Sequence, residues 1–154
     1  MDASDILAEV QHRVLGRPIQ ARRLAGNSLL VFVDGEPGSA SGVTLWFEPT
    51  WHLRDRTRVL TGSREAQHNP DAPDPDAGFY RAAAAVDALI GAVITALRVD
   101  PVTRDLRLET RTGLTLCTFV SDPADDHFWH IRDAATKQVV YAGAAGLERR
   151  GPDV

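Results

Sequence analysis

Histidine, arginine and tryptophan recur together at matched positions in two short stretches of this chain. Residues 51–55 are WHLRD, and residues 129–133 are WHIRD. If each stretch is a β-strand, its tryptophan and its leucine or isoleucine point to one face, while His52 and Arg54, or their counterparts, point to the other. Catalysis requires unlike groups that converge on one point, which an alternating pattern does not provide. The pentapeptide therefore predicts an architectural unit whose tryptophan faces the core.

The outward-facing side chains continue past the first pentapeptide, because we expect residues 51–60 to form one strand. The side chains that would share its outer face, called the arginine row, are His52, Arg54, Arg56 and Arg58. The second copy stops at His130 and Arg132. Arginine binds carboxylates and phosphates through paired hydrogen bonds, so the row predicts a binding surface. The alternative is a solvated strand face whose charges protect a sheet edge from aggregation.

Trp46 adds an aromatic side chain to this predicted surface. A hairpin through residues 48–50 would place Phe47 opposite Trp51 on the core face and leave Trp46 outside, beside the arginine row. An exposed tryptophan among arginines is typical of the residues that dominate binding energy at protein interfaces. The predicted partner-binding residues are therefore Trp46, His52, Arg54, Arg56, Arg58, His130 and Arg132.

A second candidate site is the segment before the second pentapeptide. Asp125, Asp126, His127 and His130 lie close together, and carboxylate and imidazole groups can bind zinc. The two histidines are three residues apart at a loop-to-strand junction, where their side chains diverge, and no Cys-x-x-Cys pair supports them. We therefore expect an acidic, solvated turn at residues 121–127, with no metal.

Other reaction chemistry has less support in the sequence. Ser39 and Ser41 lie in a Gly/Pro/Ser loop, not in a Gly-x-Ser-x-Gly elbow. The same loop lacks the Gly-Lys-Ser/Thr ending of a phosphate loop and precedes a strand, not a helix. Cys117 is the one cysteine, so it cannot form an internal disulfide, and its apolar surroundings predict a small core residue. No catalytic residue and no cofactor is predicted.

The two pentapeptides belong to a longer internal similarity. Residues 15–24 match residues 90–99 with a constant shift, so that Gly16 pairs with Gly91. After each pentapeptide comes a β-branched pair that closes on a glycine, VLTG or VVYAG. Internal repetition changes the interpretation of any motif within it, because a copied unit recurs for structural reasons.

Each copy predicts one helix followed by four strands. Apolar residues at helical spacing predict a helix that ends before Gly16, and the alanine-rich run FYRAAAAVDALIG predicts a second that ends at Gly91. The strands are expected at PIQARRL, SLLVFV, VTLWF and WHLRDRTRVL, and at VITALRV, DLRLET, LTLCTFV and WHIRD…QVVYAG. The prediction is one α+β domain over residues 1–154. It contains two α-β-β-β-β pseudo-repeats, at about residues 3–63 and 79–146, whose antiparallel sheets pack about a pseudo-twofold axis.

Composition limits the function. A chain of 154 residues buries roughly 70% of its unfolded surface, enough for one core. The net charge of −4 argues against nucleic-acid or membrane-surface binding, and four acids without a base lie in a Pro-rich linker at residues 65–78. The acidic N-terminus is unlike a signal peptide, and no apolar run is long enough to span a bilayer, so we expect a soluble, cytoplasmic protein.

The run SLLVFVDG before WHL, and DLRLETRTGLTL before WHI, resembles the strand pattern of small uncharacterised bacterial proteins. Some of those proteins are similar to immunity proteins of toxin systems. The resemblance covers the β segments of both halves and carries over no catalytic or binding position. It implies a protein that acts by binding a partner.

These observations favour a non-enzymatic protein-binding module, of the immunity type, that sequesters a partner with an acidic surface. The alternative is a small-ligand-binding or enzymatic domain with a pocket at the seam between the two halves, where sites often form. A third possibility is the subunit of a structural homodimer. A convergent pocket around His52 or His130 would favour the enzymatic alternative.

Overall fold

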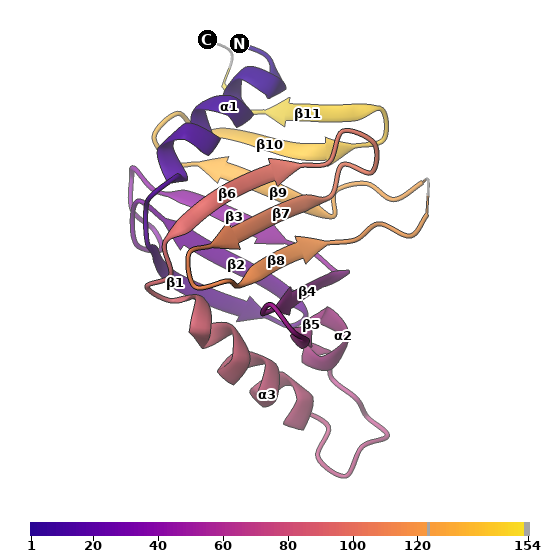
Figure 1. The fold of residues 1–154 in the computed structure, drawn as a ribbon. Coiled ribbons are helices and arrows are strands. Elements are labelled where there is room, and N and C mark those ends of the chain that lie inside the picture. The colour runs from indigo at the N-terminus through magenta and orange to yellow at the C-terminus, as the bar shows by residue number, and fades with distance from the viewer. Residues whose placement is uncertain (123, 153–154) are drawn as a thin grey trace.

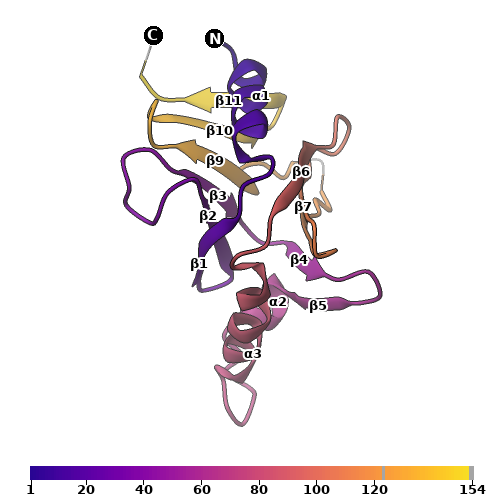
Figure 2. The ribbon, with the colours of Figure 1, turned by 60° about the vertical axis from the view of Figure 1, so that its left-hand side comes forward.

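Two antiparallel sheets pack face to face, and helices close the two ends of the space between them (Figures 1 and 2). This mixed α+β architecture is seen in a computed structural model, which describes residues 1–122 and 124–152. Residue 123, inside the predicted turn at 121–127, and residues 153–154, at the end of the predicted domain, lie outside the described residues. No helix in the described ranges is long and apolar enough to cross a membrane.

The larger sheet has six strands. Their order is β1 (Ile19–Ala25), β2 (Ser28–Val33), β3 (Val43–Phe47), β9 (Trp129–Asp133), β10 (Gln138–Gly143) and β11 (Gly146–Arg150). The smaller sheet has five strands, in the order β5 (Val59–Gly62), β4 (Trp51–Arg54), β8 (Thr115–Thr118), β7 (Leu106–Thr110) and β6 (Ile94–Val99). The sheets lie one behind the other in Figure 1 and are seen from the side in Figure 2.

The first helix, α1 (Ala3–Val14), begins at Asp2 because Asp2 and Asp5 each accept a hydrogen bond from the other's backbone N–H, which is a capping box. Gly16, with φ of +78°, turns the chain away just after the helix, as the sequence predicts. The short helix α2 (Ser63–Ala66), the helix α3 (Ala77–Val86) and the 3-10 turn η1 (Asp87–Leu89) follow the first five strands. The helix α1 packs against β6, β10 and β11, whereas α3 packs against β5.

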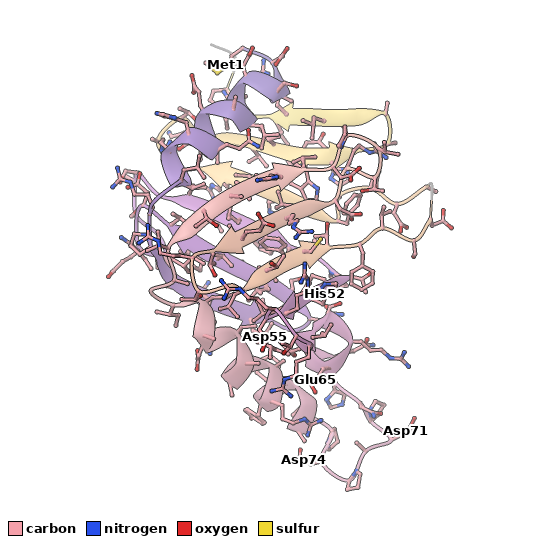
Figure 3. The ribbon with its side chains drawn as sticks, in the orientation of Figure 1. Met1, His52, Asp55, Glu65, Asp71 and Asp74 are labelled. Atoms are coloured by element: carbon pink, nitrogen blue, oxygen red, sulfur yellow. The ribbon has the colours of Figure 1, made fainter. Side chains whose placement is uncertain are left out.

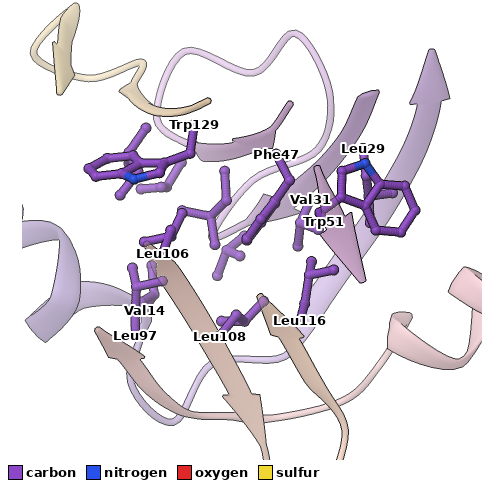
Figure 4. Packing of buried hydrophobic residues seen from close by; sticks show 14 of the residues in the cluster. Val14, Leu29, Val31, Phe47, Trp51, Leu97, Leu106, Leu108, Leu116 and Trp129 are labelled. Carbon is purple, nitrogen blue, oxygen red and sulfur yellow. The ribbon is translucent and has the colours of Figure 1, made fainter. Parts of the chain in front are cut away.

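The core lies between the sheets and is built mostly from strand residues, many of which alternate with partly exposed positions, and the helices add apolar residues such as Val14 and Val86. Leu45, Leu53, Leu108 and Leu116 are fully buried in this cluster. Trp51 and Trp129 lie near its two ends, with the smaller side chains between them (Figure 4). Both tryptophans therefore face inward, as the pentapeptides predict.

Both pentapeptides hold their neighbours in the same way. The indole N–H of Trp51 donates to the backbone oxygen of Asn27, at 2.7 Å, in the turn between β1 and β2. The indole N–H of Trp129 donates to the backbone oxygen of Arg104, at 2.6 Å, in the connection between β6 and β7. Each buried N–H is thus satisfied by a carbonyl, as most buried polar groups are.

The predicted hairpin between Phe47 and Trp51 is wrong. The strand β3 pairs with β2 and β9, and β4 pairs with β5 and β8, so residues 48–50 carry the chain from one sheet to the other. Each sheet therefore contains strands from both parts of the chain. Local patterns do not determine which strands pair, because pairing depends on residues far apart in sequence.

The predicted single strand over residues 51–60 is also wrong. The strand β4 ends at Arg54, and a turn closed by a hydrogen bond of 3.0 Å from Asp55 N–H to the Arg58 oxygen precedes β5. The carboxylate of Asp55 accepts from the backbone N–H groups of Thr57 and Arg58. Aspartate favours such turns because its side chain bonds its own backbone two residues on. The arginine row is therefore not the face of one strand.

The strand count of each part also differs from the prediction. Five strands precede α2, and six follow α3, because WHIRD and QVVYAG are separate strands and β11 was not expected. The predicted linker at 65–78 is shorter, since α2 ends at Ala66 and α3 begins at Ala77. Asp71 and Asp74 lie in the loop between them, which projects away from both sheets (Figure 3).

The matched segments at residues 15–24 and 90–99 contact each other directly. Gly16 N–H donates to the oxygen of Ile94 at 2.8 Å, and Gly91 N–H donates to the oxygen of Ile19 at 2.7 Å. These are equivalent residues of the two segments, so the contact is reciprocal. It joins the starts of β1 and β6, which are edge strands of the two sheets.

Candidate binding groove

The outward side chains of the six-stranded sheet form two rows that run across all six strands. Their members are set by the register, because residues directly opposite each other on neighbouring strands lie on the same face. The first row is Arg23, Leu30, Trp46, His130, Tyr141 and Glu148. The second row is Ala21, Phe32, Thr44, Arg132, Val139 and Arg150.

Aromatic and aliphatic side chains form the floor of this face. Trp46 and His130 are cross-strand partners whose rings stack with centroids 4.7 Å apart. Leu30 and Phe32 flank them on β2, and each is only 6% exposed although it lies outside the main core cluster. The indole N–H of Trp46 is shut off from solvent without a hydrogen-bond partner. Such an unpaired group costs about 1–3 kcal/mol, so this face retains an unsatisfied donor.

A groove of about 650 Å³ lies over this floor. Pro37 and Gly38 close one side, from the loop between β2 and β3 that projects beyond the six-stranded sheet (Figure 2). None of the described helices lies across this face, since α1 and α3 sit at the ends of the sandwich (Figure 2). The groove crosses the junction of β3 and β9, where the two parts of the chain meet in this sheet.

Four cationic side chains surround the groove. They are Arg23, Arg132, Lys137 and Arg150. All four are exposed, and among the described residues none of them forms an ion pair. Their charges are therefore available to an anion that enters the groove. Arginine is suited to this task because its guanidinium can bind a carboxylate through two hydrogen bonds.

Burial lowers the pKa of His130 below its ordinary value of 6.5, and the nearby guanidinium of Arg150 lowers it further, although the carboxylate of Glu48 opposes the shift. The neutral imidazole is thus favoured in the free protein. The neighbouring ring of Tyr141 carries Arg150 over it at 5.8 Å and stacks with His127 at 4.5 Å. The hydrogen bond and charge of Glu148 raise the Tyr141 pKa above 10.

The outer face of the five-stranded sheet carries different side chains from the outer face of the six-stranded sheet at the positions that correspond in the two pentapeptides. His52 pairs with Cys117 where His130 pairs with Trp46 on the other sheet. Arg107 and Glu109 form an ion pair at 2.9 Å on this face, which neutralises part of its charge. His52 lies on this side of the molecule, near β4, in Figure 3. The face thus lacks the stacked tryptophan at this position.

The seven predicted partner-binding residues are divided between these places. Trp46, His130 and Arg132 meet in the groove. His52 and Arg54 lie on β4 of the five-stranded sheet, and Arg56 and Arg58 lie in the turn between β4 and β5. Trp46 is on the outer face as predicted, but its neighbour is His130 and not the arginine row.

Several groove residues were missed by the sequence argument. The strand SLLVFV is apolar at nearly every position, which is typical of a strand covered on both faces and could have indicated Leu30 and Phe32. Arg23 lies on an expected strand but outside the two pentapeptides, and Lys137 lies in no motif. Arg150 lies in β11, for which no strand was predicted.

The other candidate sites take ordinary structural positions. Among the described residues, no group of three His, Cys, Asp or Glu side chains is placed to hold a metal ion. His127 stacks on Tyr141 while His130 stacks on Trp46, so the two imidazoles have different neighbours. Cys117 is half-buried on the outer face of the five-stranded sheet and not in the core as predicted, and burial raises its pKa.

No protein-family model matches the chain, and neither a curated protein nor a solved structure matches it.

Proposed function

We propose that this chain is a non-enzymatic protein-binding module that holds an acidic partner in the groove on its six-stranded sheet. The observation that carries the proposal is an apolar and aromatic floor surrounded by four cations without ion-pair partners. Apolar sheet faces are normally covered by another layer, and a partner would supply that layer here. A partly exposed tryptophan beside arginine, as at Trp46, is also the composition that dominates binding energy at interfaces.

The comparison between the two outer faces supports a specific role for this groove. Corresponding positions carry His130 with Trp46 on one sheet and His52 with Cys117 on the other. A requirement of the fold would act on both sheets alike, whereas a binding function acts on one. The stacked Trp46–His130 pair and the apolar floor beside it distinguish the six-stranded sheet, and a binding function accounts for them.

Sequestration of a partner, as in an immunity protein, is the form of binding that we propose. A groove that binds by charge and stacking needs no reacting group, and a sequestering protein acts by covering its target. The groove also crosses the seam between the two parts of the chain, and its volume of about 650 Å³ falls in the range of small-ligand pockets. His130 lies in this groove and burial lowers its pKa, which is the feature that would favour an enzyme. A domain that binds, or acts on, a small anionic ligand is accordingly the second candidate.

We also propose that the chain arose by duplication of one helix-and-strand unit. The reciprocal bonds of Gly16 and Gly91 support this origin, as does the equivalent anchoring of Trp51 and Trp129. The first strand of each half has a register shift at the same place, between Ile19 and Ala21 in β1 and at the matching positions of β6. Under this proposal each half contributes its last strands to the other half's sheet, about a pseudo-twofold axis.

Capture of a partner from a lysate of the source organism tests the binding function. The wild-type chain should retain one protein in stoichiometric amount, and Arg132→Glu should lose it. Arg54→Glu is the matched control, because this arginine has the corresponding place on the other sheet. Loss of capture in both variants, or in neither, would show that the groove is not the binding surface.

A further inference from the structure

We infer that the end of the groove around Val139 is a carboxylate subsite, where Arg132 and Arg150 grip an Asp or Glu side chain of the partner. This inference rests on the proposed binding function and names the chemistry that the partner must present. The groove would then have two parts, an anion-binding end and an apolar floor around Trp46 and Phe32.

The register of the sheet places the two arginines on either side of Val139. Arg132 on β9 is opposite Val139, and Val139 is opposite Arg150 on β11. Their backbones are therefore separated by two strand spacings, which is about 10 Å. An arginine side chain spans more than half of this distance, so both guanidiniums can reach an oxygen held above the short valine.

The surroundings restrain Arg150 and the chain that follows it. Arg150 lies over the ring of Tyr141 at 5.8 Å, which is a cation–π contact. The chain after β11 is fixed because the side-chain amide of Gln138 donates to the Pro152 oxygen at 2.8 Å. A Cβ at Gly151 would lie 2.7 Å from the Lys137 oxygen, so the end of the chain passes directly against the residue that supplies the third charge.

The extra strand β11 explains why the subsite occurs on one sheet. On the five-stranded sheet, Arg54 is paired with Val59, as Arg132 is with Val139. There β5 is the edge strand, so no further strand among the described residues supplies a second arginine. The strand β11 thus adds the cation that completes the pair. This comparison also provides a control, because Arg54 keeps the first half of the arrangement.

The occupant that fits both parts is an acidic side chain next to an aromatic one. The carboxylate would lie between the guanidiniums, and the aromatic ring would cover the floor beside the Trp46–His130 stack. The groove cations have no ion-pair partners among the described residues. Charge complementarity therefore favours an acidic peptide over a basic or neutral one.

Titration of the 15N-labelled protein with acetyl-Glu-Phe-Glu-amide tests the subsite by amide chemical shifts. We expect shifts at Arg132, Val139 and Arg150, and weaker binding of the neutral probe acetyl-Gln-Phe-Gln-amide. Removal of one exposed charge pair should weaken binding by about fivefold in Arg132→Gln and in Arg150→Gln. Arg54→Gln should bind the probe like the wild type, and melting curves verify that each variant is folded.

The inference is overturned if the Glu and Gln probes bind equally, if the amides of Arg132, Val139 and Arg150 do not shift, or if Arg54→Gln weakens binding as much as Arg132→Gln. It is also overturned if inorganic phosphate shifts these amides while the Glu probe does not. Partner capture that requires Trp46 but neither arginine would refute the subsite and retain the binding function. Probe binding at Val139 without a captured partner would support the subsite and count against the binding function.

Discussion

Single residues in this protein have roles that depend on the face they occupy. Trp46, Trp51 and Trp129 are all tryptophans on strands, but two of them fill the core and the third forms the floor of the groove. His130 stacks on Trp46, and its pKa is lowered by burial and by Arg150 against the opposing charge of Glu48. These differences lead to two predictions.

Substitution of a core tryptophan should be costly, and the cost should be similar at the two matched positions. Trp51→Phe and Trp129→Phe each remove ring volume and leave a backbone oxygen without its indole donor, so each should lower the free energy of unfolding by about 2–3 kcal/mol. Urea denaturation measures the change. Trp46→Phe is the control and should cost under about 1 kcal/mol, because its indole N–H has no partner to lose. A larger loss at Trp46 than at Trp51 would contradict this assignment.

Acidification should destabilise the free protein through its half-buried histidines. Burial lowers the pKa values of His52 and His130 in the folded protein. In the unfolded chain both histidines return to their ordinary pKa of 6.5, so just below pH 6.5 the unfolded chain binds more protons than the folded protein. Stability is therefore fully present above about pH 6.5 and falls as the pH drops below it. The free energy of unfolding should decrease between pH 7 and pH 5, and it should decrease less in His130→Gln. An identical pH dependence in the wild type and the variant would disprove a role for His130.

At the scale of elements, a partly buried ion pair fixes how α1 meets the six-stranded sheet. Arg13 at the end of α1 donates to Asp133 at the end of β9, at 2.9 Å, and also to the backbone oxygen of Ser41 at 3.0 Å. The side chain of Asp133 is only 6% exposed. The helix is thus attached both to the sheet and to the loop that borders the groove.

Removal of this attachment should destabilise the fold measurably. Arg13→Gln leaves the buried carboxylate of Asp133 without its cation and should cost about 2 kcal/mol of unfolding free energy. Arg17→Gln is the matched control on the same segment, since Arg17 is well exposed and lies 3.7 Å from Asp34. Exposed pairs contribute little, so this control should cost under about 0.5 kcal/mol. Thermal melts compare the two, and equal losses would show that Arg13 does not stabilise the buried carboxylate of Asp133.

At the scale of the whole molecule, the exchange of strands between sheets joins the two parts of the chain. β3 pairs with β9, and β4 pairs with β8, so each sheet requires strands from before α2 and from after α3. One contiguous apolar cluster then lies between the sheets. Neither sheet can be completed by one part of the chain alone.

The two sheets should therefore unfold together. Native-state hydrogen exchange should give the amides of Leu45 on β3 and Leu116 on β8 the same free energy of opening, within about 0.5 kcal/mol. Both values should equal the free energy of global unfolding. An opening of one sheet at a clearly lower free energy would show that the exchanged strands do not couple the sheets.

The sequence by itself determined the local features of this protein. The capped helix before Gly16, the alternation of β3 and β7, and the inward tryptophans follow from side-chain period and turn chemistry, which act over a few residues. The strand pairing, and with it the groove, depended on the tertiary structure. Trp46 and His130 are 84 positions apart along the chain and meet only because β3 pairs with β9. The alternating pattern states which face of a strand is buried, but any apolar strand can satisfy it, so packing of the whole chain decides the partner.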